Sequence, residues 1–389
     1  MAYGKISSIK NAYLAALSRA NGYLKGWRTN HKIVVIESDD WGSIRTSSPY
    51  AFNYLLKKGY QLEKSCYSYD SLETNEDIEE LYKVLFSVRD CRNRPACFTA
   101  NIVLANPDFT KIESNGFDYY EYSPIDKTLQ QFQNRNRVIE LWLQGFANKC
   151  FIPQFHAREH VAWWNWLKAL KGLSTEALET FKLGMCGVPL AVSKENQSFF
   201  TPIYINKDKL KSNGVDLQKV IKEGLQLFQD ILGYKSLSTV APNVSWTDDT
   251  EKLWALSGIR FIQGGFIQES DDIAGFSKRL HYTGESNIYN SIYLTRNCSF
   301  EPSKTKNVTW VNCIRAIDLL FKLSQPAIIC SHRVNYIGSI NPKNRDRSLD
   351  QLKNLLMMIV KKWPDVIFLS SPELGMLIEK DLKSRRYSL

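Results

Sequence analysis

Two of the five histidines in this 389-residue chain stand only four residues apart. They are His156 and His160 in the segment Gln-Phe-His-Ala-Arg-Glu-His, which comes directly after an apolar run. Upstream, the apolar residues 33–36 lead into Glu-Ser-Asp-Asp-Trp-Gly, in which Asp39 and Asp40 are adjacent carboxylates before a turn-forming glycine. Two imidazoles and one carboxylate can hold a catalytic divalent metal while leaving coordination positions for water and substrate. The second aspartate is then free to act as a base.

The elements that would position these residues are short β-branched runs that alternate with longer helical patterns. The predicted strands cover residues 33–38, 97–103, 151–156, 237–241, 260–263, 291–295, 327–331 and 366–370. The predicted helices cover residues 76–88, 136–147, 161–171, 216–232, 248–257, 311–323 and 348–362. Strands that alternate with helices need crossover connections, which imply a parallel sheet covered by helices. Seven or eight such units predict a closed barrel.

Polar residues follow nearly every predicted strand. They are Asp39-Asp40, Asn101, His156, Pro242-Asn243, Gln263, Arg296-Asn297 and His332-Arg333. Because the loops after the strands of a parallel barrel build its active site, we expect these residues to converge there. The segment 184–215 interrupts the alternation, and we expect it to form an excursion that shapes a substrate groove.

The composition is that of a folded enzyme-sized chain. Apolar residues make up 44% and aromatic residues 12%, which suffices for a substantial core. No stretch approaches the roughly 20 apolar residues of a membrane-spanning helix, and no secretory signal is evident, so we expect a cytoplasmic protein. The eight cysteines lack CxxC spacing, which predicts reduced and mostly buried thiols.

The net charge of +10 is spread over many short basic groups. This pattern predicts a solvated surface without a nucleic-acid partner; the alternative is attraction to an anionic glycan carrier or an acidic membrane face. In residues 9–27, apolar and basic residues recur at helical spacing. Such a helix can lie peripherally on a membrane or pack onto its own domain. We expect residues 1–30 to form this helix and residues 31–380 to form a single barrel domain.

The order of the motifs resembles that of the polysaccharide deacetylases of the NodB-homology type, also called carbohydrate esterase family four. The resemblance covers residues 31–375 and implies a distorted (β/α)7-8 barrel. It also implies that Asp39 is the base and that His332, in Ile-Cys-Ser-His, is the general acid. The same family pattern makes the metal ligands Asp40, His156 and His160.

The chain departs from the family pattern in two places. The family has an arginine followed by prolines after its middle strand, whereas this chain has Val-Ala-Pro-Asn at residues 240–243. Arg158, Arg296 or Arg333 would have to orient the base instead. The family's Asp-x-x-Asp-Trp motif also lacks a clear counterpart, and residues 296–302 occupy roughly that region.

The chemistry expected of such a site is hydrolysis of an acetamide on a carbohydrate substrate. A divalent metal, zinc first and cobalt or nickel next, lowers the pKa of bound water to about 7 and polarises the carbonyl. Asp39 would accept the proton of the attacking water, and His332 would protonate the leaving amine. A backbone N–H in the turn at Pro242 and Asn243 would stabilise the oxyanion, and Trp246 is a candidate for stacking on a sugar ring.

The same residues also allow other interpretations. Adjacent aspartates before a glycine often form turns or helix caps, and histidines are often structural. A metal-dependent glycoside hydrolase would need a second carboxylate, for which Glu301 is a candidate. A non-catalytic glycan-binding barrel is a further alternative, whereas the iron triad of oxygenases is disfavoured by the βα alternation. The motifs leave the sugar, its carrier and the acyl group open.

Overall fold

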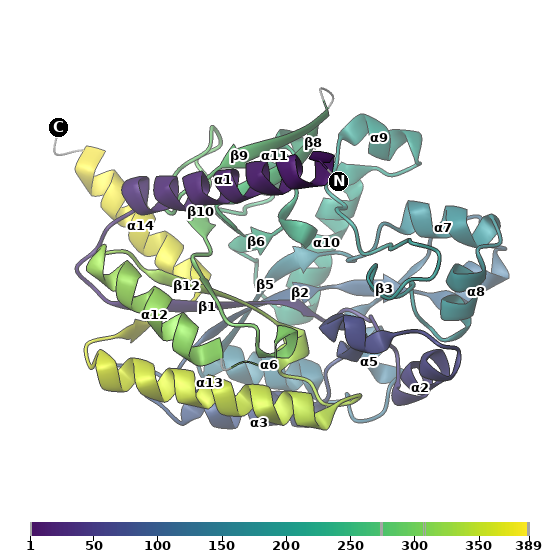
Figure 1. Ribbon diagram of the computed structural model, residues 1–389, viewed down its shortest axis with the longest axis horizontal. Helices are drawn as coiled ribbons and strands as arrows, with labels where there is room; N and C mark the ends of the chain where they lie inside the picture. Colours follow the sequence, from purple (N-terminus) through teal and green to yellow (C-terminus); the bar gives the residue numbers. More distant parts are fainter. Residues whose placement is uncertain (1, 273–274, 306, 308, 387–389) are drawn as a thin grey trace.

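The protein is described by a computed structural model that covers residues 2–272, 275–305, 307 and 309–386. In this part of the chain, one nine-stranded parallel sheet curls into a barrel (Figure 1). The strand order is β10-β7-β6-β5-β2-β1-β12-β11, and β13 also pairs with β1. The bounds are β1 (Ile33–Trp41), β2 (Phe98–Val103), β5 (Phe151–Ala157), β6 (Ser238–Val240), β7 (Phe261–Gly264), β10 (Ile292–Thr295), β11 (Cys298–Ser299), β12 (Ala327–His332) and β13 (Ile367–Phe368). The predicted βα barrel is thereby confirmed, and among the strands of this sheet only the two-residue β11 had not been predicted.

The barrel closes through the chain and not through a continuous ladder of strands. β10 and β11 lie at opposite ends of the strand order, yet only Arg296 and Asn297 separate them in sequence. The Arg296 N–H donates to the carbonyl of Gly264 on β7 at 2.7 Å, and the Asn297 N–H donates to that of Ile328 on β12 at 3.0 Å. This two-residue link therefore spans the seam of the barrel, and its first residue is an arginine.

Helices cover the outside of the barrel (Figure 1). Local signals set their ends: Thr74 and Asp77 form a capping box at the start of α3, and Gly233, with a φ of 80°, ends α10. The helices that follow strands are α3 (Asn75–Phe86), α6 (Val138–Ala147), α7 (Trp163–Lys171), α10 (Leu217–Leu232), α11 (Asp248–Leu256), α12 (Thr309–Lys322), α13 (Pro342–Lys362) and α14 (Ser371–Arg386). The remaining α-helices are α1 (Ala2–Lys25), α2 (Pro49–Lys57), α4 (Phe109–Ser114), α5 (Ile125–Gln130), α8 (Thr175–Lys182) and α9 (Lys207–Ser212).

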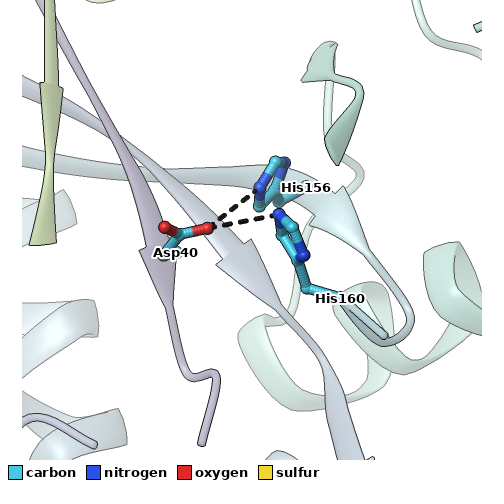
Figure 2. Close-up of side chains that lie close together, drawn as sticks. All are labelled: Asp40, His156 and His160. Carbon is cyan, nitrogen blue, oxygen red and sulfur yellow. Dashed lines mark ion pairs between the residues drawn. The ribbon is translucent and has the colours of Figure 1, made fainter. Parts of the chain in front are cut away.

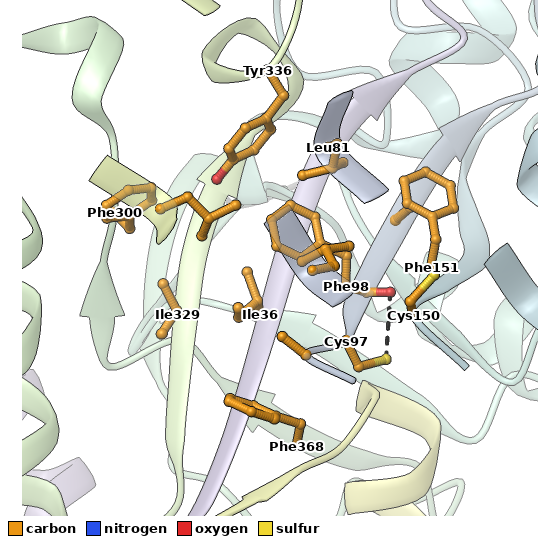
Figure 3. Packing of buried hydrophobic residues seen from close by; sticks show 14 of the residues in the cluster. Ile36, Leu81, Cys97, Phe98, Cys150, Phe151, Phe300, Ile329, Tyr336 and Phe368 are labelled. Atoms are coloured by element: carbon orange, nitrogen blue, oxygen red, sulfur yellow. Dashed lines mark hydrogen bonds between the residues drawn. The ribbon is translucent and has the colours of Figure 1, made fainter. Parts of the chain in front are cut away.

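The largest apolar core lies between one side of the sheet and the helices outside it (Figure 3). Strand residues Ile36, Phe98 and Ile329 pack there with Leu81 of α3 and with Tyr336. All nine residues of β1 are buried, as expected for a strand covered on both faces. β1 thus lies inside the sheet, between β2 and β12, and the candidate carboxylates lie at its carboxyl end.

Two small hairpins and one long excursion complete the fold. The hairpins pair β3 (Ala105–Pro107) with β4 (Tyr122–Pro124), and β8 (Ile267–Asp272) with β9 (Gly275–Leu280). The excursion predicted at 184–215 contains α9 and otherwise little regular structure. None of the helices in the described part of the chain combines the length and the apolar character that crossing a membrane requires.

Candidate metal centre and catalytic cavity

A bulge at the end of β1 brings two adjacent aspartates into one cavity. Successive side chains of a regular strand point to opposite faces. The β1–β2 register shifts between Ser38 and Trp41, and Asp40 has a φ of 74°. Such a bulge reorients the side chains around it. Asp39 and Asp40 consequently both line the same cavity.

A second bulge presents the first histidine. In the β2–β5 ladder, Ile102 pairs with Phe155 and Val103 with Ala157, so His156 is the extra residue. His160 lies four residues farther on, in the loop before α7. The Nε2 atoms of His156 and His160 each lie 3.5 Å from Oδ1 of Asp40 (Figure 2). These three buried side chains form a group of potential metal ligands.

The donor set fits a divalent cation. The Nδ1 atom of His156 lies 2.8 Å from the carbonyl oxygen of Val240, so Nδ1–H donates there and Nε2 is the ring nitrogen turned toward Asp40. In the neutral tautomer with Nδ1–H, the Nε2 lone pair would face the Asp40 oxygen at 3.5 Å, which is repulsive unless positive charge lies between the two atoms. Two atoms bound to one tetrahedral zinc ion lie about 3.3–3.4 Å apart, close to the spacing of both imidazoles from Asp40.

The protonation states also suit metal binding. Burial, with the nearby Arg45 charge, lowers the pKa of His160 to about 3, so the imidazole is neutral at pH 7. Burial alone would raise the pKa of Asp40, but the Arg45 guanidinium holds that pKa well below its usual range. Arg45 Nη2 lies 3.2 Å from Oδ2 of Asp40, which leaves Oδ1 to face the histidines. Neutral imidazoles and an ionised carboxylate are the forms that ligate metals.

Arg296, the first residue of the seam link, forms a bidentate ion pair with Asp39. Its Nη1 and Nη2 atoms donate to Oδ2 and Oδ1 of Asp39, both at 2.7 Å, and its Nε donates to Glu37 at 2.6 Å. Asn101 adds a hydrogen bond to Oδ1 of Asp39 at 2.7 Å. Burial opposes ionisation, but the Arg296 charge and hydrogen bonds lower the pKa of Asp39 well below its ordinary value. Of the three candidate arginines, Arg296 is the one that contacts the proposed base.

His332 lies beside Asp39 on the neighbouring strand. The two residues are register partners in the β1–β12 ladder, and His332 Nε2 lies 4.0 Å from Oδ2 of Asp39. Nδ1 of His332 is 2.5 Å from Oε1 of Glu301, whose other oxygen accepts a hydrogen bond from Asn335 at 2.8 Å. Burial alone would lower the pKa of His332, but Glu301 and the two aspartates raise it above its ordinary value. The pairing thus favours an imidazolium that faces the cavity.

Arg158, Trp246 and Arg333 were expected at the site, but their side chains have other partners. Arg158 pairs with Glu159 and Glu223 and stacks over the Tyr122 ring, so its charge is directed away from Asp39. Trp246 is 1% exposed and donates to Glu251, within an apolar core that also contains Trp254. The expectation that it stacks on a sugar is therefore wrong.

Arg333 is also wrongly expected to orient the base. It is completely buried, with Nε and Nη2 on Asp70 at 3.1 and 2.8 Å, and Nη1 on Glu73 at 2.8 Å. Glu73 in turn accepts the Gly42 N–H at 3.0 Å. The arginine therefore supports the loop that follows β1 and does not contact Asp39.

We expect Arg333→Met to destabilise the fold. The substitution leaves Asp70 and Glu73 buried with less compensating charge, and breaking such a pair costs about 3–5 kcal/mol. Urea denaturation measures the difference in unfolding free energy. Arg137→Met, which removes an exposed ion pair with Glu79, is the control and should cost no more than about 1 kcal/mol. Equal stability of the two variants would contradict the structural role of Arg333.

The cavity around these residues has a volume of about 640 Å³. The excursion contributes Pro189, Leu190, Ser198, Phe200, Thr201 and Pro202 to its wall. Asn243 and its neighbours Ala241 and Val244 also line it, whereas Pro242 is buried in the turn. The backbone of Asn243 has a φ of 58°, so the turn is tightly folded at this point.

Arg45 and Tyr67 are among the side chains that line the cavity and were missed by sequence reasoning. Arg45 lies in the loop after β1, with its guanidinium 4.5 Å from the Phe200 ring centre and 5.2 Å from that of Tyr67. The rule that loops after strands build the site could have indicated Arg45, which follows Asp40 by five residues. Tyr67 comes from a 3₁₀ turn between α2 and α3, for which the sequence carries no comparable signal.

Comparisons with known proteins add a likeness of fold. No family model and no curated protein sequence matches the chain. The solved structures matched include a protein described as a glycoside hydrolase/deacetylase from Parabacteroides distasonis, with 9% identity over 90% of this chain and 72% of that one and a TM-score of 0.47. A probable polysaccharide deacetylase from Pseudomonas aeruginosa PAO1 has 9% identity, coverages of 89% and 91% and a TM-score of 0.44. PuuE allantoinase has 11% identity, coverages of 90% and 91% and a TM-score of 0.43.

Proposed function

We propose that the protein is a metal-dependent hydrolase that removes an N-acetyl or O-acetyl group from an amino sugar of a polysaccharide or glycan precursor. The observation that carries this proposal is the grouping of Asp40, His156 and His160 around one point, with Asp39 and His332 at its side. Zinc is the first candidate for the metal, followed by cobalt and nickel.

The cation would supply an activated water molecule and would polarise the acyl carbonyl. Asp39 is the group in this chain that would take the proton of that water during attack, since it is ionised and lines the cavity. Arg296 and Asn101 fix the orientation of its carboxylate from both oxygens. The base is thereby positioned before substrate arrives.

The departing amine requires a proton, and His332 is placed to donate it. Glu301 raises the pKa of the imidazolium and fixes the ring through Nδ1, which leaves Nε2 toward the cavity. The backbone N–H of Asn243, in the turn that lines the cavity, would donate to the oxyanion. Base, acid and oxyanion donor would thus come from three different strand ends.

The alternative of a glycoside hydrolase needs a second free carboxylate across the scissile bond. Glu301, the candidate for that role, is buried and uses both oxygens, one on His332 and one on Asn335. The missing family arginine made a non-catalytic glycan-binding barrel more credible, but Arg296 reaches Asp39 from the seam link. These contacts favour the deacetylase.

In the decisive experiment, the purified protein is incubated with zinc, cobalt or nickel and with N-acetylated or O-acetylated amino sugars, and the products are measured. Metal-dependent release of acetate supports the proposal. Cleavage of a glycosidic bond, or tight glycan binding without turnover, would replace it by one of the two alternatives.

We expect Glu301→Gln to shift the alkaline limb of the pH profile of kcat/KM toward lower pH. The raised pKa of His332 keeps the imidazolium, the form able to donate a proton, present to higher pH, and activity is lost as pH rises through that pKa. Glutamine preserves the size of the side chain but removes the charge. His332→Ala should abolish the limb and slow release of the amine. An unshifted limb in Glu301→Gln would remove Glu301 from this role.

A further inference from the structure

The first helix of the chain is fixed to the barrel by one face. α1 lies on the outer surface of the domain (Figure 1). Gln325 Nε2 donates to the carbonyls of Gly22 and Tyr23, both at 3.1 Å, and the Tyr23 ring meets Phe266 edge-on at 6.0 Å. Ser18 and Gly22 are buried at this contact. The orientation of the helix about its axis is therefore set by the domain.

The opposite face of α1 is apolar and points to solvent. Tyr13, Leu17 and Leu24 are 66%, 42% and 75% exposed, and Ala20 is exposed as well. At about 100° per residue these four side chains fall within roughly 60° of one another, so they form one stripe. A helix whose apolar residues stabilised its own domain would bury this stripe, whereas the structure buries the other face.

Trp27 does not belong to this outer stripe, although helical spacing predicts it there. It follows the end of α1, is 8% exposed, and its Nε1 donates to Asp381 of α14 at 2.7 Å. Ile9 continues the spacing toward the N-terminus, but its side chain lies outside the described residues. The stripe defined by the structure thus consists of Tyr13, Leu17, Ala20 and Leu24.

Positive charge flanks the stripe. The α1 sequence contains four basic residues and no acidic one. The exposed Arg19 and Lys25 project to the two sides of the stripe, about 120° from its centre, and the whole chain carries a net charge of +10. An apolar stripe with basic flanks is the pattern of helices that lie in the interface of an anionic membrane.

We propose that the stripe and its basic flanks dock the protein on an anionic membrane surface, with α1 parallel to the bilayer plane. A second copy of the chain suits this face less well, because a symmetric pairing of α1 with itself would place basic residues opposite basic residues with no acid in either helix. An anionic bilayer accepts both the apolar side chains and the flanking cations.

Vesicle co-sedimentation of the full chain tests this assignment. The wild type should bind phosphatidylcholine vesicles that contain phosphatidylglycerol, bind pure phosphatidylcholine more weakly, and lose affinity as salt is raised. Leu17→Glu combined with Leu24→Glu should lower the partition coefficient about tenfold or more. The matched control combines Leu173→Glu and Met357→Glu, which are 74% and 50% exposed and lie outside α1, and it should bind almost as the wild type does.

A second pair of variants tests the charge. Arg19→Glu with Lys25→Glu should abolish the preference for phosphatidylglycerol, whereas Lys343→Glu with Lys353→Glu, an equal charge change on exposed residues of α13, should largely keep it. Circular dichroism and thermal unfolding establish that each variant is folded. The proposal is overturned if the folded wild type ignores anionic vesicles, or if the α1 variants bind as their controls do. It is also overturned if the wild type instead forms a dimer or captures an acidic protein through the stripe without binding vesicles.

Discussion

His156→Ala and His160→Ala should each lose the metal, with the dissociation constant raised by at least about a hundredfold. Removing even an outer partner of a ligand costs about 10–100-fold in metal affinity, and here a donor atom itself is removed. Both Nε2 atoms lie 3.5 Å from Asp40 Oδ1, so either deletion leaves only two protein donors at this point. Metal content after dialysis and titration with cobalt, followed by its absorption spectrum, measure the loss.

His281→Ala and His31→Ala are the matched controls for these two deletions. His281 is buried like His156 but bonds Gln268 and Glu285, and His31 is exposed. Both variants should retain the metal of the wild type. Stoichiometric metal in His156→Ala or His160→Ala, at wild-type affinity, would show that the three side chains do not form the centre.

The barrel could be predicted because buried parallel strands leave a simple signal in sequence. Residues 33–36 and 327–330 are continuous apolar runs, since both faces of β1 and β12 are covered. Turn and cap residues then mark the helices between them. β11 was not predicted because two residues are too few to show a periodicity. The closure of the barrel through the seam link was not predictable either, because it depends on pairing with strands distant in sequence.

The candidate site was predictable as a set of residues but not as a geometry. The strand-end rule groups Asp39, Asp40, His156 and His332, and the structure brings these side chains together. Strict alternation along β1 would have separated the two aspartates, and only the bulge, with its positive φ at Asp40, allows both to face the cavity. A bulge depends on the facing strand, so one segment of sequence does not reveal it.

Which of the three arginines contacts Asp39 also could not be predicted, because the answer depends on contacts between residues distant in sequence. Each follows a predicted strand, and their types are identical. Arg296 reaches Asp39 because the seam link carries it across the barrel, a contact between residues 257 positions apart in sequence. Arg158 and Arg333 have acidic neighbours of their own. Ion-pair partners of this kind are set by the closed fold.

Asp39→Asn should keep the metal and lose catalysis, with kcat lowered by about 10²–10⁴-fold, the usual contribution of a general base. Asparagine matches the shape of aspartate and leaves an oxygen to accept from Arg296, which also keeps its bond to Glu37. It cannot accept the proton of an attacking water. In the wild type, the Asp39 carboxylate is ionised far below neutral pH. The asparagine of the variant does not titrate, so raising the pH should not restore its turnover.

Asp40→Asn is the matched control, because it makes the same chemical change one residue away. Asp40 faces both histidines, so its amide should weaken metal binding, whereas Asp39→Asn should bind metal as the wild type does. Metal content and acetate release measured together separate the two roles. Full turnover in Asp39→Asn would assign the proton transfer to another group. Metal loss in Asp39→Asn would instead make Asp39 a ligand, and the assignment of Asp39 as the base and Asp40 as the metal ligand would have to be reversed.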